Sequence, residues 1–465
     1  MGGLFGVYSN TDCVEDVFYG TDYHSHLGTK RGGLAIKNAG GFQRFIKDIT
    51  TSQFRSKFDR DIKKMHGNKG IGVISDYEDQ PLIISSHLGI FAISTVGKIN
   101  NIEELANEAL QNGTHFSEMH GSEINPTEMV ATIISQENTF ERGIQKVQNM
   151  IDGSCTLLIL TDEGIYAARD KLGRTPLVIG KKLGSFAVAM ESCAFPNLGF
   201  DITKYMGPGE IIFINENGLE QLVPPAKRLQ ICSFLWVYYG YPASNYEGIN
   251  VETVRYRCGA YLRKEDDLEI DLVAGIPDSG TAHGLGYANE AQIPFARPFV
   301  KYTPTWPRSF MPQEQSIRDT VAKMKLIPIK ELIADKRLLF CEDSIVRGTQ
   351  LRRQVERLFE SGAMEVHMRP ACPPLVYGCK FLNFSRSRSE LDLAGRWAIK
   401  DLIGEDLENP IEYTDPDSDK YKAMVNVIRE KLHLTTLKYQ RLENLVKAIG
   451  LPKEKLCTYC WDGVE

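Results

Sequence analysis

The sequence predicts a mixed α/β and α+β protein with two domains, and three observations lead to this expectation. Its 465 residues exceed what one hydrophobic core usually holds, so two domains are expected. The first half contains short apolar runs separated by Gly, Asn and Asp turns, which indicates a strand-rich domain. In the second half apolar strands alternate with helical patterns, as parallel βαβ units require.

In the first half, five short runs have the alternation or continuous apolar character of strands, and two longer stretches have helical periodicity. The expected strands are Gly70 to Ile74, Leu88 to Ser94, Cys155 to Leu160, Phe186 to Met190 and Glu210 to Ile214, and the expected helices lie near Ile102 to Leu110 and Pro126 to Ile134.

A domain boundary is expected around Pro224-Pro225, which divides the chain into residues 1–225 and 226–465. Beyond it, strands are expected at Leu268 to Ala274 and Lys336 to Cys341. The tail from Asp419 to Ile449 is expected to be mostly helical and to end before Gly450 and Pro452.

The segment from Leu338 to Gln350 carries the strongest chemical signal in the chain. An apolar run leads into the adjacent acids Glu342 and Asp343, then into a loop containing Gly348, and a helical pattern follows. Ligands of parallel sheets bind at the carboxyl ends of the strands, where a helix N-terminus favours phosphate and paired acids can take two ribose hydroxyls. A sugar phosphate is therefore the expected ligand. The alternative is an ordinary strand-loop-helix turn with solvated acids.

The run Glu342-Asp343-Ser344-Ile345-Val346-Arg347-Gly348-Thr349 closely resembles the phosphoribosylpyrophosphate (PRPP) signature of type I phosphoribosyltransferases, in the form found in the glutamine PRPP amidotransferase family. A second segment, Pro277-Asp278-Ser279-Gly280-Thr281, is similar to the pyrophosphate-binding loop of that family. Lys301 and Arg308 bracket a segment similar to its flexible catalytic loop. The resemblance covers nearly the whole chain.

The resemblance implies an N-terminal Ntn-hydrolase-like αββα sandwich over residues 1–225 and a type I phosphoribosyltransferase domain with a parallel sheet over residues 226–465. It implies that Asp278, Ser279, Gly280 and Thr281 bind pyrophosphate. It also implies that Mg²⁺ accompanies PRPP at Glu342 and Asp343. In this chain Glu342 replaces the first aspartate of the signature, which keeps the charge.

The catalytic loop departs from the family pattern. Between Lys301 and Arg308 this chain reads Tyr-Thr-Pro-Thr-Trp-Pro, one residue longer than the family segment. Its two prolines fix backbone angles where a closing loop usually bends. Loop closure is therefore expected to differ.

Ten cysteines in a chain without a secretion signal favour thiols or metal ligands over disulfides. The resemblance implies a [4Fe-4S] cluster on Cys232, Cys379, Cys457 and Cys460. Four thiolates suit zinc as well as iron-sulfur on charge grounds, so the choice of cluster rests on the resemblance. The other six cysteines are expected to be small buried hydrophobes: Cys13, Cys155, Cys193, Cys258, Cys341 and Cys372.

The glutaminase half departs from the family at its nucleophile. Family members begin the mature chain with a cysteine whose thiolate attacks glutamine while its own amine acts as base. Here Gly2 stands in that place, and glycine has no nucleophile. Cys13 is a poor substitute because it lacks an adjacent terminal amine.

Four further positions change in the same direction. An arginine of the family is lost at His26-Leu27-Gly28-Thr29, and the arginine for the glutamine carboxylate is lost at Ser75-Asp76-Tyr77-Glu78. The Asn-Gly pair of the oxyanion hole reads Val96-Gly97, and the aspartate for the glutamine amine reads Gly121 before Ser122-Glu123. These losses predict an inactive glutaminase pocket on a retained scaffold.

Composition excludes several other classes of function. A net charge of −6 with scattered basic residues does not favour nucleic-acid binding. No apolar run approaches the ~20 residues that a spanning helix needs, and the N-terminus lacks the pattern of a signal peptide. A cytoplasmic protein without membrane contact is expected. The resemblance adds a homo-oligomer and purine nucleotide effectors.

Three functions remain open. The first is a glycosyltransferase that makes phosphoribosylamine for purine biosynthesis from PRPP and ammonia, either free or delivered by a partner glutaminase. The second is a non-catalytic PRPP or nucleotide sensor that regulates an intact amidotransferase. The third is a phosphoribosyltransferase acting on another amine or a base. The resemblance by itself implies glutamine-dependent activity, which the changed residues contradict.

Overall fold

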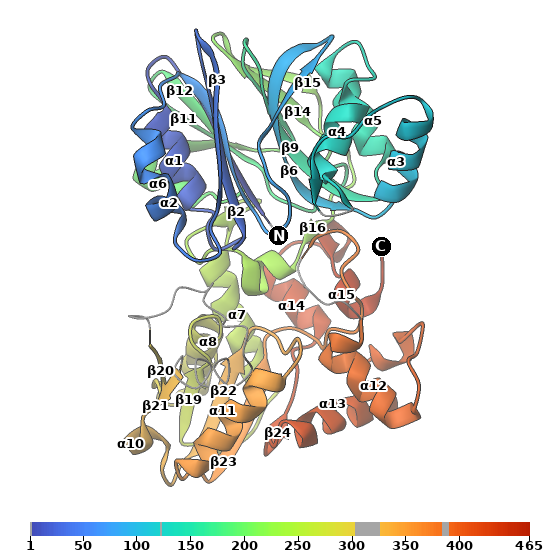
Figure 1. Cartoon of the computed structure of the whole chain (residues 1–465). Helices are drawn as coiled ribbons and strands as arrows, with labels where there is room; N and C mark the ends of the chain where they lie inside the picture. The colour runs from blue at the N-terminus through green and yellow to red at the C-terminus, as the bar shows by residue number, and fades with distance from the viewer. Residues whose placement is uncertain (1, 121–122, 303–325, 384–389) are drawn as a thin grey trace.

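The computed structural model describes residues 2–120, 123–302, 326–383 and 390–465. Figure 1 shows two lobes, one above the other, with the chain passing from the upper to the lower lobe. The upper lobe is a stack of two sheets flanked by helices. The lower lobe is a parallel sheet with helices on both faces.

The upper lobe contains a seven-stranded and a six-stranded antiparallel sheet among the described residues. The seven-stranded sheet has the order β13 (Asp201–Tyr205), β11 (Val178–Lys182), β12 (Ser185–Ala189), β1 (Gly3–Ser9), β4 (Lys69–Ser75), β2 (Arg31–Asn38), β3 (Gly41–Asp48). The six-stranded sheet has the order β15 (Gly218–Val223), β14 (Ile211–Asn215), β10 (Ile165–Ala168), β9 (Gly153–Leu160), β6 (Gly89–Ile99), β5 (Leu82–Ser86). A short pair, β7 (Met119–His120) and β8 (Glu123–Ile124), lies outside both sheets.

Alternating side chains of each strand build separate apolar layers. On β1, Leu4 packs between the two sheets, whereas Phe5 packs against the outer helices of the seven-stranded sheet. On β9, Leu158 joins the layer between the sheets and Ile159 the layer beneath the helices of the other sheet. This period of two residues is what a strand buried on both faces requires. The helices are α1 (Val14–Asp22), α2 (Phe54–Ile62) and α6 (Ala194–Leu198) on one side, and α3 (Ile102–Gln111), α4 (Pro126–Ile134) and α5 (Phe140–Met150) on the other.

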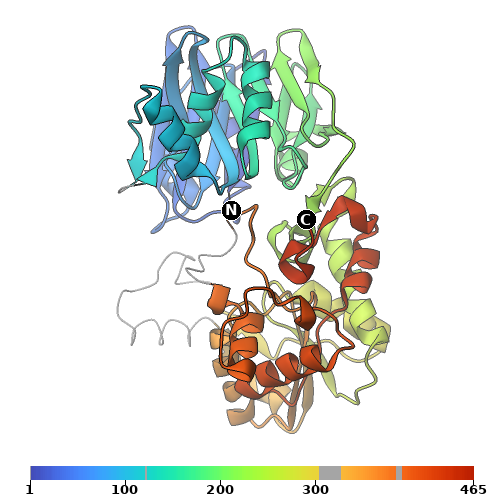
Figure 2. The same ribbon diagram turned by 90° about the vertical axis from the view of Figure 1, so that its right-hand side faces the viewer.

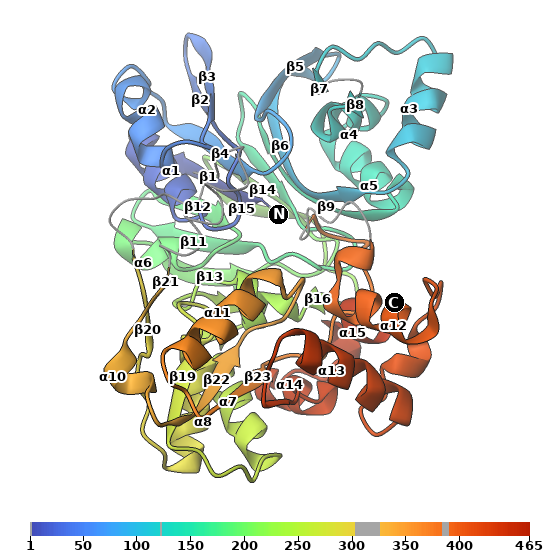
Figure 3. The same cartoon turned by 60° about the horizontal axis from the view of Figure 1, so that its bottom comes forward.

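The lower lobe is built on the parallel order β19 (Leu272–Gly275), β22 (Arg337–Glu342), β23 (Glu365–Pro370), β24 (Thr436–Leu437). Val273 and Leu339 face α7 (Val251–Lys264) and α8 (Thr281–Ala291). Ala274 and Phe340 face the opposite layer with α11 (Thr349–Glu360), α12 (Ala394–Ile403) and α13 (Asp419–Lys431). Figure 3 shows α11 beside the parallel strands, and α12 lies farther to the right, where it packs on α13.

Smaller elements complete this lobe. They are the antiparallel pair β20 (Phe299–Lys301) and β21 (Leu326–Pro328), α10 (Lys330–Ile333), α14 (Leu442–Ile449), and the short 3-10 turns η2 (Glu390–Asp392), η3 (Ile411–Tyr413) and η4 (Lys453–Lys455).

The junction between the lobes is made by short elements from both ends of the second half. They are β16 (Ile231–Cys232) paired in parallel with β25 (Leu456–Cys457), the π-helical turn η1 (Leu235–Tyr239), the hairpin β17 (Asn245–Tyr246) and β18 (Ile249–Asn250), and α15 (Tyr459–Asp462). The hairpin reaches the upper lobe, where the Tyr246 hydroxyl donates to Glu191 Oε1 over 2.7 Å. The N and C ends of the chain both lie at this junction (Figure 2).

The predicted fold class is confirmed, and the predicted elements are present with shifted ends. The helix expected at Pro126 to Ile134 is α4 with the same bounds. The strand expected at Leu268 to Ala274 begins later, at Leu272, and the helical tail is interrupted by β24. In the described parts of the chain no helix is long and apolar enough to span a bilayer.

Candidate functional site

The register of the parallel sheet brings the two predicted phosphate-binding segments together. Gly275 at the end of β19 lies opposite Cys341 near the end of β22, so the loops that follow are neighbours. Ser279 Oγ donates to Glu342 Oε1 over 2.9 Å. A side chain at Gly280 would collide with the Cys341 carbonyl oxygen, so only glycine permits this close approach.

Of the two acids Asp343 is buried and Glu342 is half-buried, and their charges act on each other. Asp343 is 6% exposed, and its backbone N–H donates to Glu342 Oε1 over 3.0 Å. Burial raises the pKa of Glu342 well above its usual value, and the neighbouring Asp343 charge raises this pKa further. A cation or the hydroxyls of a sugar would relieve this repulsion, which makes the pair suited to a Mg²⁺-bound sugar phosphate.

Arg255 of α7 interacts electrostatically with Asp343 and was not predicted from the sequence. It is 5% exposed, and its guanidinium donates to three carbonyl groups, those of Trp236 (3.0 Å), Tyr238 (2.9 Å) and Gly240 (2.8 Å). Burial lowers the pKa of Arg255, and the Asp343 charge opposes this decrease. Arg255 therefore supplies positive charge near Asp343. No sequence motif around α7 indicates this role.

The predicted phosphate loop is held in place from both sides. Ile345 is buried in the core, and the Val346 carbonyl accepts the Ala394 N–H at 2.6 Å. Gly348 precedes α11 with φ of +79°, a conformation that glycine adopts without strain. Thr349 begins α11. The loop thus leads directly into a helix N-terminus, where anions bind favourably.

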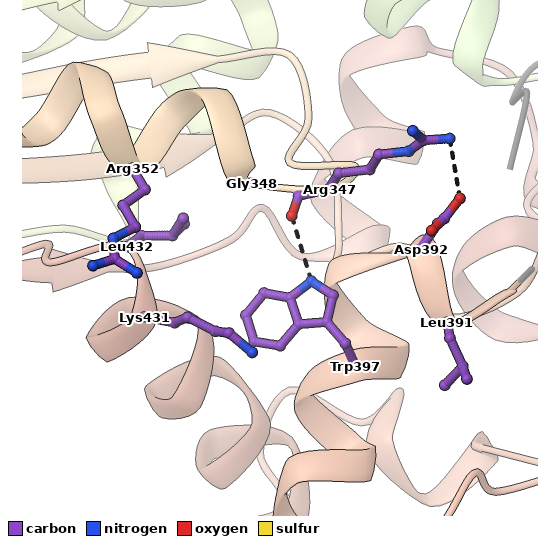
Figure 4. A pocket seen from close by; sticks show the side chains of 8 residues that line it. All are labelled: Arg347, Gly348, Arg352, Leu391, Asp392, Trp397, Lys431 and Leu432. Carbon is purple, nitrogen blue, oxygen red and sulfur yellow. Dashed lines mark hydrogen bonds and ion pairs between the residues drawn. The ribbon is translucent and has the colours of Figure 1, made fainter. Parts of the chain in front are cut away.

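A cavity of about 280 Å³ flanks this loop, and its lining residues come from the phosphate loop, α11, η2, α12 and the end of α13 (Figure 4). The lining residues are Arg347, Gly348, Arg352, Leu391, Asp392, Trp397, Lys431 and Leu432. Arg347 pairs with Asp392 over 3.1 Å, and Lys431 Nζ lies 4.1 Å from the centre of the Trp397 ring. The sequence reasoning missed Trp397 and Lys431, because they approach the loop only through the packing of α12 and α13.

Lys301 lies at the end of β20, where its Nζ forms an ion pair with Asp278 Oδ2 over 2.6 Å. The structure thus joins the first residue of the predicted catalytic loop to the predicted pyrophosphate loop. Arg308, the other predicted catalytic residue, lies outside the described residues.

The changed glutaminase positions also meet at one place. Gly2 enters β1, and a side chain there would come within 2.6 Å of the Ile74 carbonyl oxygen. Asp76 Oδ1 accepts a hydrogen bond from the Thr29 backbone N–H over 2.6 Å. Two of the segments predicted to have lost an arginine are therefore hydrogen-bonded to each other. Gly121 and Ser122 lie outside the described residues.

The space left at this place is small. A cavity of about 20 Å³ remains, lined by Gly2, Ile74, Ser75, Asp76, Tyr77, Glu78, Thr95, Val96, Gly97 and Asn383. This volume is enough for about one water molecule and far below the several hundred Å³ of ordinary small-molecule sites. Burial raises the pKa of Glu78, which lines this cavity.

The four predicted metal-binding cysteines converge on the junction between the lobes. Cys232 lies opposite Cys457 in the β16–β25 pair, and all four contact the same apolar cluster of the lower lobe. The Leu382 N–H donates to Cys379 Sγ over 3.3 Å, and an Arg174 N–H donates to Cys457 Sγ over 2.8 Å. Hydrogen bonds to sulfur of this kind stabilise thiolate ligands.

Within the described residues, no three His, Cys, Asp or Glu side chains are already arranged around a metal position. The thiols nevertheless raise one another's pKa: at Cys460 burial acts most, followed by Cys232, Cys379 and Cys457. The four cysteine thiols lie near one another, and N–H groups donate to two of them. The residues therefore fit a thiolate-bound centre in their chemistry. The other six cysteines are buried, as predicted.

Comparison with known proteins identifies similar chains for the whole length. A family model described as a glutamine amidotransferase domain matches residues 69–197. The amidophosphoribosyltransferase of Methanocaldococcus jannaschii is 29% identical, with 100% of this chain and 97% of the relative covered. The amidophosphoribosyltransferase of Bacillus subtilis is 28% identical, with 96% and 89% covered.

Solved structures agree with these relatives. The structure of the glutamine phosphoribosylpyrophosphate amidotransferase from B. subtilis complexed with ADP and GMP superimposes with a TM-score of 0.84 at 26% identity. The match covers 99% of this chain and 96% of the B. subtilis chain. A structure described as the allosteric regulatory enzyme of purine biosynthesis gives a TM-score of 0.83 at 27% identity, with 99% and 95% covered.

Proposed function

We propose, from the premise that this chain belongs to the amidophosphoribosyltransferase family, that it binds Mg-PRPP and transfers ammonia to it without using its own glutaminase pocket. The product would be phosphoribosylamine, the amine that this family supplies to purine biosynthesis. Ammonia would come from solution or from a partner glutaminase.

The observation that carries this proposal is the filled nucleophile position. Gly2 offers no nucleophile, and the Ile74 carbonyl occupies the space where a side chain would begin. The remaining cavity of about 20 Å³ is too small for glutamine. In addition, Asp76 and Glu78 line this cavity, and their carboxyl groups do not provide the cation that a glutamine carboxylate would need.

In this proposal the transferase loops supply what the displacement of pyrophosphate requires. The nitrogen lone pair of ammonia attacks the anomeric carbon, the bond from that carbon to the pyrophosphate oxygen breaks, and pyrophosphate leaves with the electron pair. The nitrogen then loses one proton to solvent. Such a step needs positioning, charge neutralisation and exclusion of water rather than a covalent intermediate.

In this proposal each loop has one task. Residues 278–281 hold pyrophosphate, Glu342 and Asp343 hold the ribose hydroxyls, and residues 344–349 hold the 5-phosphate at the start of α11. Lys301 neutralises the leaving group, since it already lies beside Asp278. When bound with PRPP, Mg²⁺ supplies further neutralisation of the departing pyrophosphate.

The proposal also places a [4Fe-4S] cluster on Cys232, Cys379, Cys457 and Cys460, with zinc as the alternative. The convergence of the four thiols and the N–H donors at Cys379 and Cys457 support it. Absorbance and metal analysis of anaerobically purified protein distinguish the two metals.

Three further expectations remain part of the proposal. They are a domain division at residue 225, a homo-oligomeric assembly, and inhibition by purine nucleotides. The coil from Pro224 to Gln230 between β15 and β16 supports the division. The B. subtilis structure that resembles this chain was solved with ADP and GMP, which supports a test of both as effectors.

Pyrophosphate release from Mg-PRPP tests the proposed reaction. It is measured with ammonium at alkaline pH and, separately, with glutamine alone, for the native chain, Asp343→Asn and the exposed control Asp267→Asn. We expect release with ammonium only, abolished by Asp343→Asn and unchanged by Asp267→Asn. Glutamine-driven release would overturn the proposal.

A PRPP sensor is the second candidate, and the two prolines between Lys301 and Arg308 favour it because they restrict a closing loop. It predicts PRPP binding with no release of pyrophosphate under either condition. Binding is measured by the rise in Tm with Mg-PRPP, again with Asp343→Asn as the negative comparison.

A further inference from the structure

Arg174 connects the upper lobe to the cysteine centre of the lower lobe. It lies between β10 and β11, where Asp170 Oδ1 accepts its backbone N–H at 3.0 Å. The residue is 3% exposed. One terminal N–H group donates to Cys457 Sγ over 2.8 Å, and the guanidinium carbon lies 3.2 Å from the centre of the Phe381 ring.

The buried guanidinium has no carboxylate partner within the described residues. Its other terminal nitrogen donates to the neutral Gln230 amide over 3.2 Å, and Nε has no hydrogen-bond partner in the described chain. A buried cation is strongly destabilising unless a negative charge lies nearby, and four neutral thiols would supply none.

A thiolate-bound centre would supply that charge. Both a [4Fe-4S] cluster and a zinc ion with four thiolates carry net negative charge, because the four thiolates outweigh the charge of the inorganic part. The Cys232 backbone N–H donates to the Arg174 carbonyl over 3.0 Å, so a second predicted ligand is fastened to the same residue.

The segment around Cys379 is fastened to the upper lobe by three more contacts. Lys98 Nζ donates to the Cys379 carbonyl over 3.1 Å, Asn100 donates to the Lys380 carbonyl over 2.8 Å, and Ser154 Oγ donates to the Phe381 carbonyl over 2.6 Å. These donors come from β6, the turn after it and β9. Ligands from three distant segments of the chain are thus held against one face of the upper lobe.

We propose that Arg174 is the charge partner of the four-thiolate centre, and that through it the centre fastens the upper lobe to the transferase lobe. The inference rests on the proposed metal centre and does not depend on the nitrogen donor or on transferase activity. Arg174 is a positioning residue, since it acts on a ligand of the centre and not on substrate.

Arg174→Gln tests the proposal in the full-length chain, purified without oxygen. This change removes the charge but keeps a hydrogen-bonding group near Phe381. Arg174→Lys keeps the positive charge but lacks the planar guanidinium with its several N–H donors. Arg228→Gln is the control, because it makes the same arginine-to-glutamine change at an exposed position. The readouts are metal and sulfide content, the reduction potential if iron is present, and the rate of metal loss to a chelator.

We expect Arg174→Gln to lose its metal about 10- to 100-fold faster, as for other residues that support metal ligands. If the centre contains iron, its potential shifts to more negative values, because a cation and an N–H donor at sulfur stabilise the reduced, more negative state. Arg174→Lys should fall between Arg174→Gln and the native chain, and Arg228→Gln should equal the native chain.

The attachment of the two lobes to each other is tested independently by the rate of proteolysis of the coil between them. Limited proteolysis of the exposed coil at residues 224–228, with a protease that does not require arginine, should accelerate in Arg174→Gln and in Cys457→Ser. The rate should remain unchanged in Arg228→Gln.

Equal metal loss and equal cleavage in Arg174→Gln and the native chain would overturn the proposal. It would also fail if the native chain holds no metal, an outcome that leaves the proposed ammonia transfer intact. If Arg174→Gln does not fold, the chelator and proteolysis measurements on Arg174→Lys decide.

Discussion

The variant Gly2→Cys tests whether adding a nucleophile is enough to produce glutaminase activity. It is produced so that the new cysteine is the first residue of the mature chain. In the structure a Cβ at residue 2 lies 2.6 Å from the Ile74 carbonyl oxygen and 3.1 Å from a Val96 methyl group. Ordinary contacts begin near 3.4 Å, so the first of these distances is short by 0.8 Å. Because Ile74 belongs to β4 and pairs with Gly3, relief requires movement of the sheet itself.

Two consequences follow from this geometry. Forcing a side chain into a packed region typically costs about 1–3 kcal/mol, so Gly2→Cys should lower the free energy of unfolding by roughly that amount. On the prediction that Val96 stands where the family has an oxyanion-hole donor, the thiolate would also lack a complete oxyanion hole. One missing donor typically lowers the rate by about 10²–10³-fold. Glutaminase activity should therefore remain at background.

The assay measures glutamate formed from glutamine, with and without Mg-PRPP, together with unfolding in urea. Gly40→Cys is the matched control, because a Cβ there meets only the Asn38 side chain, at 3.3 Å, in an exposed turn. It should change stability by no more than about 0.5 kcal/mol. Glutamate production by Gly2→Cys well above that of Gly40→Cys would refute the reasoning, as would a native-like free energy of unfolding.

Three further predictions concern the transferase lobe. Burial and the Asp343 charge raise the pKa of Glu342, so the stability that this group contributes is fully present below the usual glutamate pKa and is lost as pH rises through the folded value. Glu342→Gln should thus raise the Tm of the ligand-free protein at neutral pH and make this Tm less dependent on pH. It should also abolish the Tm increase caused by Mg-PRPP. A lower Tm of the ligand-free variant would contradict the upward direction of the Glu342 pKa shift. Arg369→Met should destabilise the lobe by about 3–5 kcal/mol in urea unfolding, because Asp266, bound through contacts of 2.6 and 3.2 Å, would become an unpaired buried charge. Asn250→Ala should cost about 1 kcal/mol in the same measurement, since the Asn250 side chain caps α7 by accepting the Thr253 N–H at 2.9 Å.

The stability that the Arg369–Asp266 ion pair contributes depends on pH, and this dependence can be measured separately. Burial alone would raise the pKa of Asp266, but the hydrogen bond and charge of Arg369 outweigh it and hold this pKa below its usual value. The stability from the pair is therefore present above the unfolded aspartate pKa and is lost as pH falls through the folded value. The difference between native and Arg369→Met unfolding should shrink in acid, and a constant difference would contradict the assignment.

The neighbouring positions of the two predicted phosphate-binding segments could be foreseen because their signals are local in sequence. The apolar strand, the acids Glu342 and Asp343, and Gly348 before a helix follow one another without interruption, and this order alone specifies a strand end opposite a helix start. By contrast, Arg255 and Trp397 could not be predicted. Each reaches the site from a helix that packs there only in the folded lobe.

The sequence by itself determined the fold class and the absence of a nucleophile at Gly2, and it predicts phosphate binding at residues 344–349, since each depends on residue identity and on periodicity within a short segment. The tertiary structure alone decided that the Ile74 carbonyl closes the space beside Gly2, and that Arg174 meets Cys457 across 283 positions of the chain. Such contacts follow from strand register and from the packing of one lobe on the other. No short-range pattern encodes them, because the partners become neighbours only when the two lobes fold and dock.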